Sequence, residues 1–510
     1  MEIYDLFYKW IPIYLRVPVL ILLFFVILCA NGVFLGNLTD MASSLGMYPE
    51  HYTAAVNAMY IGMALGLMTE VRLKLRYSSK TLLLAGLSTM LLMKIICATT
   101  SNPWITIIAV FILGFAKISA LIEVYIVQLM LWSKQLDTSR FYPFVYFVAL
   151  GGLYLTSWGT ASLAYYYNWR YAYILAVMIL LVAILLTVLL VENHPLKKTM
   201  AISGMDWGSL FLLGVSMLLL NYVVVYGRVE DWFYSDSIKL AAFGFIFSFL
   251  VFLKRTLSIS APFFKLELFR KPTFRIGLLL FFILGVFSPG TFQSAFSAGI
   301  LQYDTPTNMQ LNLFLIPGVT AASIICFIWY YRKLDPEPMI IIGFAGFVVY
   351  HIMMYQSFSN EFALTDFWAP SIVKGFATCA IYIAVGLYTT KNFDLGVVMM
   401  AGGVMILVRS FLGSGIFSGV YNYILYAERV RHLDKLAVMT DRGGFFPNQL
   451  TGSGLYKALA EQSTLAASKE VTGYIIIFGF VLVAVLTLYY IRIKIIGTAP
   501  AVTPEPPLVK

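Results

Sequence analysis

Uncharged stretches long enough to cross a membrane recur along the whole chain, and this repetition constrains the fold more than any other feature. Residues 17–39, 141–169 and 471–491 contain no charged side chain and have 23, 29 and 21 residues. A helix needs about 20 apolar residues to cross a hydrocarbon core about 30 Å thick. The pattern therefore predicts an all-α polytopic membrane protein, in which each charge inside a span is energetically expensive.

Fourteen such spans are predicted from end to end. Their approximate bounds are 17–39, 53–71, 80–98, 103–131, 141–166, 170–191, 207–227, 238–253, 275–298, 309–331, 338–357, 366–389, 396–426 and 471–492. Only 12% of the 510 residues are charged, against about 25% in soluble domains, so a large soluble domain is not expected. The net charge of +10 is interpreted as basic residues on the cytoplasmic face rather than as a nucleic-acid site.

The distribution of lysine and arginine predicts the orientation. With a cytoplasmic N-terminus, 22 of the 35 basic residues lie in cytoplasmic segments, nine lie in outer segments and four lie inside spans. This asymmetry follows the positive-inside rule and predicts that both termini are cytoplasmic.

The spans group as six, two and six, which predicts the domain organisation. A cytoplasmic or interfacial segment is followed by a six-helix bundle, a two-helix insert with a cytoplasmic linker, a second six-helix bundle and a disordered tail. The corresponding ranges are 1–16, 17–192, 193–274, 275–493 and 494–510. The second bundle includes an outer loop of 44 residues, 427–470, and a loop of this length is usually functional or disordered.

Charged residues inside the spans are the first candidates for function. Glu123 is the carboxylate placed most clearly deep in a span, and a buried carboxylate suits proton binding and release; the alternative is a salt bridge that locks helices together. Lys117 lies six residues earlier, about 240° around the helix, so the two side chains do not share a face. Lys117 either faces the central cavity and attracts an anionic substrate or pairs with a neighbouring helix.

The other in-span cations have different expected roles. Lys94 is expected to extend outward to the membrane surface, and Lys374 lies two turns into its span. Arg409 lies on one helical face with Gly402 and Gly413, which favours a structural or gating role over substrate contact.

Polar side chains and small residues complete the candidates. Asn31, Asn57 and Gln128 either line a substrate cavity or make hydrogen bonds between helices. Pairs of glycines four residues apart predict close helix contacts; they are Gly32 with Gly36, Gly62 with Gly66, and Gly415 with Gly419. No phosphate-binding loop, metal-binding pair or nucleophile elbow is present in the sequence, so no enzyme activity, cofactor or metal is predicted.

Several strings of residues then follow one another in a characteristic order. They are Asn168-Trp169-Arg170-Tyr171, Asp206-Trp207-Gly208, Leu268-Phe269-Arg270, Leu315-Ile316-Pro317-Gly318, and Gly402-Gly403 with Arg409 and Gly413. Together they resemble the 14-helix drug/proton antiporters of the major facilitator superfamily, of the EmrB/QacA type. A basic stretch with a histidine, residues 428–436, resembles part of the outer loop of EmrB-type proteins.

The resemblance implies a major facilitator fold in a bacterial inner membrane and proton-driven export of hydrophobic or amphipathic compounds. It implies lipids, protons and a hydrophobic small molecule as partners, with a periplasmic adaptor protein docking at residues 427–470. It also suggests gating or structural roles for Glu70 and Arg72, which lie at the end of the second span, and for Pro317, Arg409, Gly402 and Gly413.

The chain departs from this family at positions that bear on coupling. Asn31 stands where the family carries an aspartate in the first helix, and Val110 stands where it carries an arginine in the fourth. Two further hypotheses therefore stay open: a lipid or nutrient carrier with different coupling, and a non-transporting membrane scaffold or sensor.

Overall fold

The chain folds into a helical bundle. The computed structural model describes residues 6–133, 137–193, 206–259, 266–359, 362–391, 393–441 and 452–497. Within these ranges, fourteen helical segments are long and apolar enough to cross a membrane, and the extended structure is limited to one isolated bridge between Phe7 and Val191. The number and order of the predicted spans are thereby confirmed.

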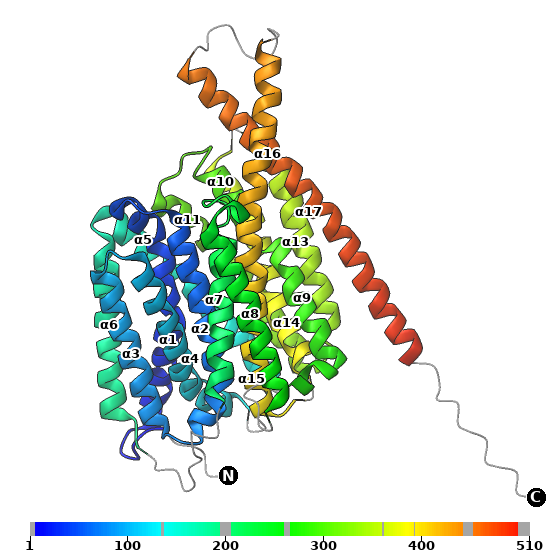
Figure 1. Cartoon of the computed structure of the whole chain (residues 1–510). Helices are drawn as coiled ribbons and strands as arrows, with labels where there is room; N and C mark the ends of the chain where they lie inside the picture. Colours follow the sequence, from blue (N-terminus) through cyan, green and yellow to red (C-terminus); the bar gives the residue numbers. More distant parts are fainter. Residues whose placement is uncertain are drawn as a thin grey trace, which may run out of the picture.

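Six helices form the first half of the bundle, on the left of Figure 1. They are α1 (Ile13–Leu45), α2 (Pro49–Lys74), α3 (Ser79–Thr99), α4 (Pro103–Trp132), α5 (Thr138–Tyr166) and α6 (Trp169–Leu190). Polar caps begin several of them: the side chains of Asn102, Asp137 and Asn168 each accept a hydrogen bond from a backbone N–H in the first turn.

Glycines bring helices of this half into backbone contact. A Cβ atom on Gly62 would lie 2.1 Å from the carbonyl oxygen of Phe111, and one on Gly114 would lie 2.2 Å from that of Met59. The two glycines thus let α2 and α4 pack backbone to backbone. Gly32 and Gly36 pack equally closely against α5, which confirms the close contacts predicted from their spacing.

Two helices, α7 (Trp207–Tyr226) and α8 (Asp236–Ser258), lie between the halves. Asp206 caps α7 by accepting a hydrogen bond from the backbone N–H of Ser209, and its Oδ1 also lies 2.9 Å from Nε of Arg255 near the end of α8. Asn221 of α7 accepts a hydrogen bond from Asn57 of α2 at 2.9 Å. The two helices of the insert are therefore bonded to each other, and α7 is also bonded to the first half.

The second half contains more irregular helices. Its elements are α9 (Pro272–Phe287), α10 (Thr291–Ser297), α11 (Thr305–Leu313), α12 (Ile316–Tyr331), α13 (Glu337–Ser357), α14 (Trp368–Thr389), α15 (Leu395–Ile406), the π-helix η5 (Leu407–Gly415), α16 (Ile416–Asp441) and α17 (Ser453–Gly497). Two predicted spans are broken. A proline lies at or just after each break, Pro289 between α9 and α10 and Pro317 in the first turn of α12, because proline has no N–H for the helix ladder.

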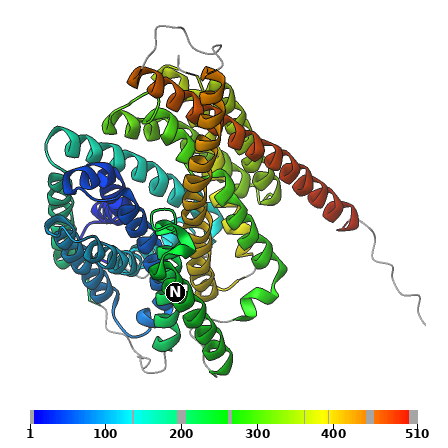
Figure 2. The same cartoon turned by 45° about the horizontal axis from the view of Figure 1, so that its top comes forward.

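The predicted outer loop is largely helical. α16 continues to Asp441 and α17 begins at Ser453, and both project beyond the level of the other helices (Figures 1 and 2). Residues 442–451 between them lie outside the described residues, as does most of the predicted tail, because α17 ends at Gly497.

The N-terminal segment packs against the first half from residue 6 onward. Leu6, Phe7 and Ile11 are buried, and the backbone N–H of Tyr8 donates to the carbonyl of Leu190 at 3.1 Å. The segment therefore leads into α1 along the end of α6.

Candidate transport site between the two halves

Two buried carboxylates, one on α2 and one on α4, lie near the C-terminal end of α2. Glu123 of α4 is buried, and its Oε2 lies 2.7 Å from Nζ of Lys74, which is partly exposed. Glu70 of α2 is also buried, and its Oε2 accepts a hydrogen bond of 2.8 Å from Ser119. Glu70 was expected at the edge of its span; instead α2 continues to Lys74 and encloses it. Glu123 is therefore not the only carboxylate deep in the bundle.

The charges in this group are unequal. The Oε1 atoms of Glu70 and Glu123 are buried and have no hydrogen-bond partner. A buried carboxylate oxygen without a partner is costly when the group is charged, and only the ammonium of Lys74 is ion-paired within the group. We call Glu70, Lys74, Ser119 and Glu123 the acidic group.

The side chains of Lys117 and Lys94 both donate hydrogen bonds to the middle of α1. Nζ of Lys117 donates to Oδ1 of Asn31 at 2.7 Å and to the carbonyl of Leu28 at 2.9 Å. Nζ of Lys94 donates to the carbonyl of Ala30 at 3.2 Å. The expectation that Lys94 extends outward is wrong: its side chain is buried, because the carbonyl of Ala30 in α1 accepts a hydrogen bond from its ammonium group inside the bundle. Lys117 and Glu123 have different partners, as their spacing predicts.

The other polar cavity candidates are also bound within the bundle. Asn57 donates to Asn221 of α7, and Nε2 of Gln128 donates to the carbonyl of Leu20 in α1 at 3.2 Å. Asn31, Asn57, Lys117 and Gln128 are all buried. The structure does not bring these four side chains together around one space; each joins its helix to a neighbour.

Arg409 is a charged side chain at the contact between the halves. It lies on the π-helix η5, and such segments are frequent at functional sites. Its Nη1 donates to the hydroxyl of Tyr146 in α5 at 3.0 Å. Its guanidinium carbon lies 4.1 Å from the ring centroid of Tyr382 in α14 and 5.8 Å from that of Phe281 in α9.

Further tyrosines surround this arginine. Tyr146 packs edge to face on Tyr382, with ring centroids 5.7 Å apart. Tyr60 of α2 lies close enough to interact electrostatically with Arg409 and Tyr382, and Tyr154 of α5 with Tyr382. All four rings are half-buried rather than buried, so space of at least the size of a water molecule reaches them. We call Arg409 and these four tyrosines the Arg409 cluster.

Nothing in the sequence singles out these tyrosines. The chain has 33 of them, and a tyrosine within an apolar span is an ordinary membrane residue. The one sequence signal at this site is the positive charge of Arg409, for which the sequence predicts a structural or gating role.

The glycine and proline candidates lie at helix contacts. Gly413 packs on Gly285 of α9: a Cβ atom added to Gly285 would lie 2.6 Å from the backbone of Gly413. Gly402 faces Leu67 of α2, and Pro317 is exposed in the first turn of α12. Arg72 is exposed near the end of α2. None of these four positions belongs to the Arg409 cluster, and their gating role stays a prediction.

Lys374 forms a second polar centre within the second half. Its Nζ lies 3.4 Å from the hydroxyl of Tyr350 and 3.5 Å from Oε1 of Gln293. His351, next to Tyr350, is buried and hydrogen-bonded to the carbonyl of Phe347, so it is a packed polar group.

A cleft opens between the halves near the start of α5. It has a volume of about 600 Å³ and is lined by the start of α5, by the ends of α12 and α14 with the loops that follow them, and by α15, with Asp137, Lys333, Asp335 and Lys391 contributing charges. Thr390 at its wall bonds to Tyr142, whose ring packs edge to face on Tyr146. The cleft therefore approaches the Arg409 cluster from the end where α5 begins.

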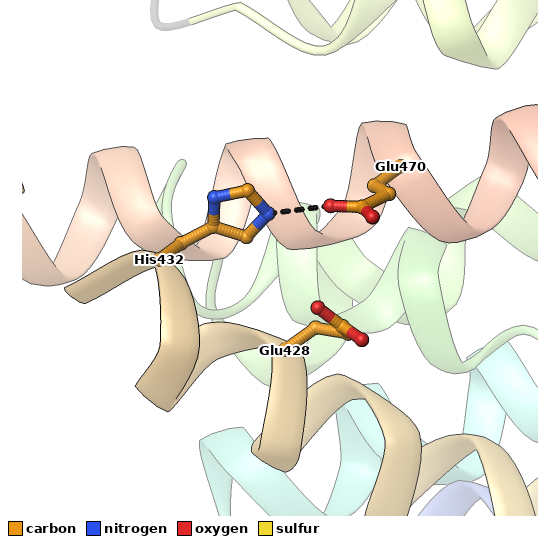
Figure 3. A group of neighbouring side chains, drawn as sticks. All are labelled: Glu428, His432 and Glu470. Carbon is orange, nitrogen blue, oxygen red and sulfur yellow. Dashed lines mark hydrogen bonds and ion pairs between the residues drawn. The ribbon is translucent and has the colours of Figure 1, made fainter. Parts of the chain in front are cut away.

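A last group of titratable side chains lies on the projecting helices (Figure 3). Glu428, His432 and Glu470 offer ligand atoms within 4.8 Å of one another. Arg431, however, lies 2.6 Å from Glu470 and 2.8 Å from Glu428, and His432 lies 2.8 Å from Glu470. The carboxylates are thus already satisfied by an arginine, and the group fastens α16 to α17 rather than presenting free ligands.

Fourteen membrane-length helices in two groups, with buried charges inside and between them, define a multi-pass membrane transporter. The chain belongs to the Major Facilitator Superfamily, whose family model matches residues 20–418. This membership makes it a transporter rather than an enzyme, as expected, and confirms the superfamily resemblance.

Two curated relatives are similar to more than half of this chain. The colistin resistance protein EmrB of Acinetobacter baumannii is 21% identical over 323 residues, which cover 58% of this chain and 60% of that protein. The putative multidrug resistance protein MdtD of Salmonella typhi is 23% identical over 286 residues, covering 55% and 56%. The matched regions therefore span less than two thirds of either relative.

Solved structures show the same fold. The nucleoside transporter NupG has a TM-score of 0.53 at 13% identity, covering 93% of this chain and 99% of that one. A structure of a proton dependent oligopeptide transporter has a TM-score of 0.59 at 11% identity, covering 94% and 99%.

Proposed function

We propose that this protein exports hydrophobic or amphipathic compounds across a bacterial inner membrane in exchange for protons. The printed names of the two curated relatives, which concern colistin and multidrug resistance, support the export of such compounds. The two halves rock about the contact at the Arg409 cluster and expose it to each side in turn, the mode of transport common to this fold.

The acidic group is the observation that carries the proton-coupling part of the proposal. Glu70 and Glu123 are buried, only Glu123 is ion-paired with Lys74, and each has one oxygen without a hydrogen-bond partner among the described residues. A buried carboxylate that loses its ion-pair partner favours the protonated form. Lys74 is partly exposed and gives the group a polar route to solvent. When Lys74 moves away from Glu123, that carboxylate becomes the proton acceptor.

The test uses purified protein in proteoliposomes with an imposed pH gradient and a panel of fluorescent amphipathic dyes. Glu123→Gln should lower gradient-driven dye movement at least ~10-fold, because the amide cannot exchange a proton, while dye exchange without a gradient persists. Asp236→Asn is the matched control, since Asp236 is exposed and pairs with Lys239 at the surface. If Glu123→Gln retains full gradient-driven transport, Glu123 is not the coupling residue.

The orientation in this proposal places both termini in the cytoplasm and the projecting parts of α16 and α17 in the periplasm. We propose that these two helices dock a periplasmic adaptor protein. They extend beyond the bundle (Figure 1) and carry exposed apolar side chains such as Val430, Val438 and Tyr456. Exposed apolar side chains that gather on one surface are typical of a site that binds another protein.

Photo-crosslinkers at Val430, Val438 and Tyr456 would test the docking in cells that co-express an adaptor. A crosslinked adduct at one or more of these positions is expected, with none from Leu240, an exposed apolar residue of α8. Absence of an adduct at all three positions would remove the docking proposal without affecting the transport proposal.

A carrier of lipids or nutrients with different coupling is the second candidate. The observation that favours it is the pair of Lys117 with neutral Asn31, where the resembled family carries an aspartate. Substrate exchange that proceeds equally with and without a pH gradient would favour this carrier. Absence of any transport in either condition would instead indicate a scaffold or sensor.

A further inference from the structure

We infer that the transported compound is an organic anion whose carboxylate or sulfonate group binds Arg409, with an aromatic or apolar body against the surrounding tyrosines. This inference rests on the proposed transport function and names its substrate class.

Four basic side chains inside the bundle have no acidic partner in the part of the chain that the structure describes. They lie inside the spans predicted from the sequence: Lys94, Lys117, Lys374 and Arg409. Each is held by neutral groups, namely carbonyls, amides and phenols. Among the described residues, none of these four forms an ion pair with a carboxylate. These four side chains therefore carry positive charge that no carboxylate among the described residues neutralises, which favours an anion beside one of them in a region of low dielectric. The buried carboxylates Glu70 and Glu123 lie instead with Lys74 in the acidic group.

Arg409 is the one of these four that lies between the halves. Arginine has five N–H donors in a planar fork that matches a carboxylate or sulfonate. One of its nitrogens, Nη1, bonds to the phenol of Tyr146, and Nε is buried without a partner. Stacking on Tyr382 orients the guanidinium but does not neutralise its charge. A bound anion would supply the missing acceptor.

The tyrosines supply the surface for the rest of the compound. Tyr60 and Tyr146 come from the first half, and Tyr382 comes from the second, so one ligand would contact both halves. Their rings are half-buried, with aromatic faces and hydroxyl groups bordering the same place. Such a surface accepts an apolar body and adds few orienting hydrogen bonds, as expected of an amphipathic ligand site.

A second cation lies on the same side of α14. Lys374 and Tyr382 are eight residues apart, about 12 Å along the helix, with Thr378 between them hydrogen-bonded to the carbonyl of Lys374. Lys374 is half-buried and faces Tyr350. An anion leaving Arg409 toward that end of the bundle would pass a second positive charge, whereas a cation would be repelled at both places.

Binding of three small probes with one ring system would test the charge preference. The probes are 1-naphthoate, 1-naphthamide and the 1-naphthylmethylammonium ion, which carry charges of −1, 0 and +1. The full-length protein is measured in nanodiscs of neutral phosphatidylcholine, without a pH gradient, and empty nanodiscs are subtracted. The wild type should bind naphthoate at least ~10-fold more tightly than the ammonium probe, the ratio that one charge-assisted hydrogen bond provides.

Variants of Arg409 then locate the site. Arg409→Gln should weaken naphthoate binding at least ~10-fold and leave naphthamide binding within ~2-fold. Arg409→Lys should lose part of the naphthoate affinity, because it keeps the charge and loses the fork. Arg228→Gln is the matched control, since Arg228 also lies over a tyrosine ring, that of Tyr426, but outside the cluster.

Two outcomes would overturn the inference. One is wild-type protein that binds the ammonium probe as tightly as naphthoate, a result that requires no variant to fold. The other is Arg409→Gln protein that keeps its naphthoate affinity. Because binding is measured without a gradient, loss of proton coupling would overturn the proposed coupling and leave this inference standing; charge-blind binding with intact proton-driven transport would do the reverse.

Discussion

Nζ of Lys117 on α4 donates a hydrogen bond of 2.7 Å to Oδ1 of Asn31 on α1, so a buried ammonium ion is held by a neutral amide. The same nitrogen also donates to the carbonyl of Leu28. Removing one partner of a buried charged group leaves the other unsatisfied and is strongly destabilising, whereas replacing both by apolar groups of similar volume is often tolerated.

The first prediction follows from this pair. Asn31→Leu should destabilise the protein by about 3 kcal/mol, because Lys117 keeps its charge and loses its closest acceptor. The double variant Asn31→Leu with Lys117→Met should recover most of the loss. Thermal unfolding of the detergent-solubilised variants measures both effects. A double variant no more stable than Asn31→Leu would show that the pair is not an independent unit.

The second prediction concerns the contact between α2 and α4. Gly62→Ala should destabilise the fold by roughly 1–3 kcal/mol, since the new Cβ would lie 2.1 Å from the backbone oxygen of Phe111. Gly159→Ala is the matched control in a membrane-spanning helix, because nothing lies within 4 Å of its Cβ. The control should be neutral or slightly stabilising. Equal thermal shifts in the two variants would contradict the close contact.

The third prediction concerns pH and the two-helix insert. Burial opposes ionisation of Asp206, but hydrogen bonds from Ser209 and Arg255 outweigh it and hold the pKa of this carboxyl below its ordinary value. A carboxyl with a lowered pKa stabilises the fold above its ordinary pKa of about 3.9, and this stabilisation is lost as the pH falls through the lowered value.

Asp206→Asn should keep the helix cap and lose the ion pair with Arg255. Arg255 is half-exposed, so the cost at pH 7 should stay below about 1 kcal/mol. The difference from wild type should shrink as the pH falls below about 4, as measured by thermal unfolding across a pH series. A difference that grows at acid pH would give the wrong sign and refute the assignment.

The fourth prediction concerns the link between α16 and α17. Spin labels at Val438 and Lys457 should report a broader distance distribution in Arg431→Gln than in wild type, because that arginine bonds to both oxygens of Glu470. Adding Zn²⁺ to the wild type should leave the distribution unchanged. A distribution that narrows with Zn²⁺ would instead make Glu428, His432 and Glu470 a metal site.

The predicted spans agree with the structure because hydrophobic length is written directly in the sequence. The positions of helix breaks and the partners of buried polar side chains cannot be read from the sequence in this way. The break before α12 falls within an apolar run, and its only sequence signal is Pro317. The burial of Lys94 depends on a carbonyl of α1 that is 64 residues away in the chain. The tyrosines around Arg409 come from α2, α5 and α14, so only the packed bundle brings them together.

The irregular helix that carries Arg409 also reaches the projecting hairpin. α15, η5 and α16 follow one another without a gap from Leu395 to Asp441, and Thr440 lies 31 residues beyond Arg409, about 46 Å along the axis. A tilt of only ~10° at the π-turn would sweep the far tip through roughly 8 Å. A compound that binds Arg409 as inferred, and tilts the helix there, would therefore move the projecting helices at which the proposed adaptor protein docks.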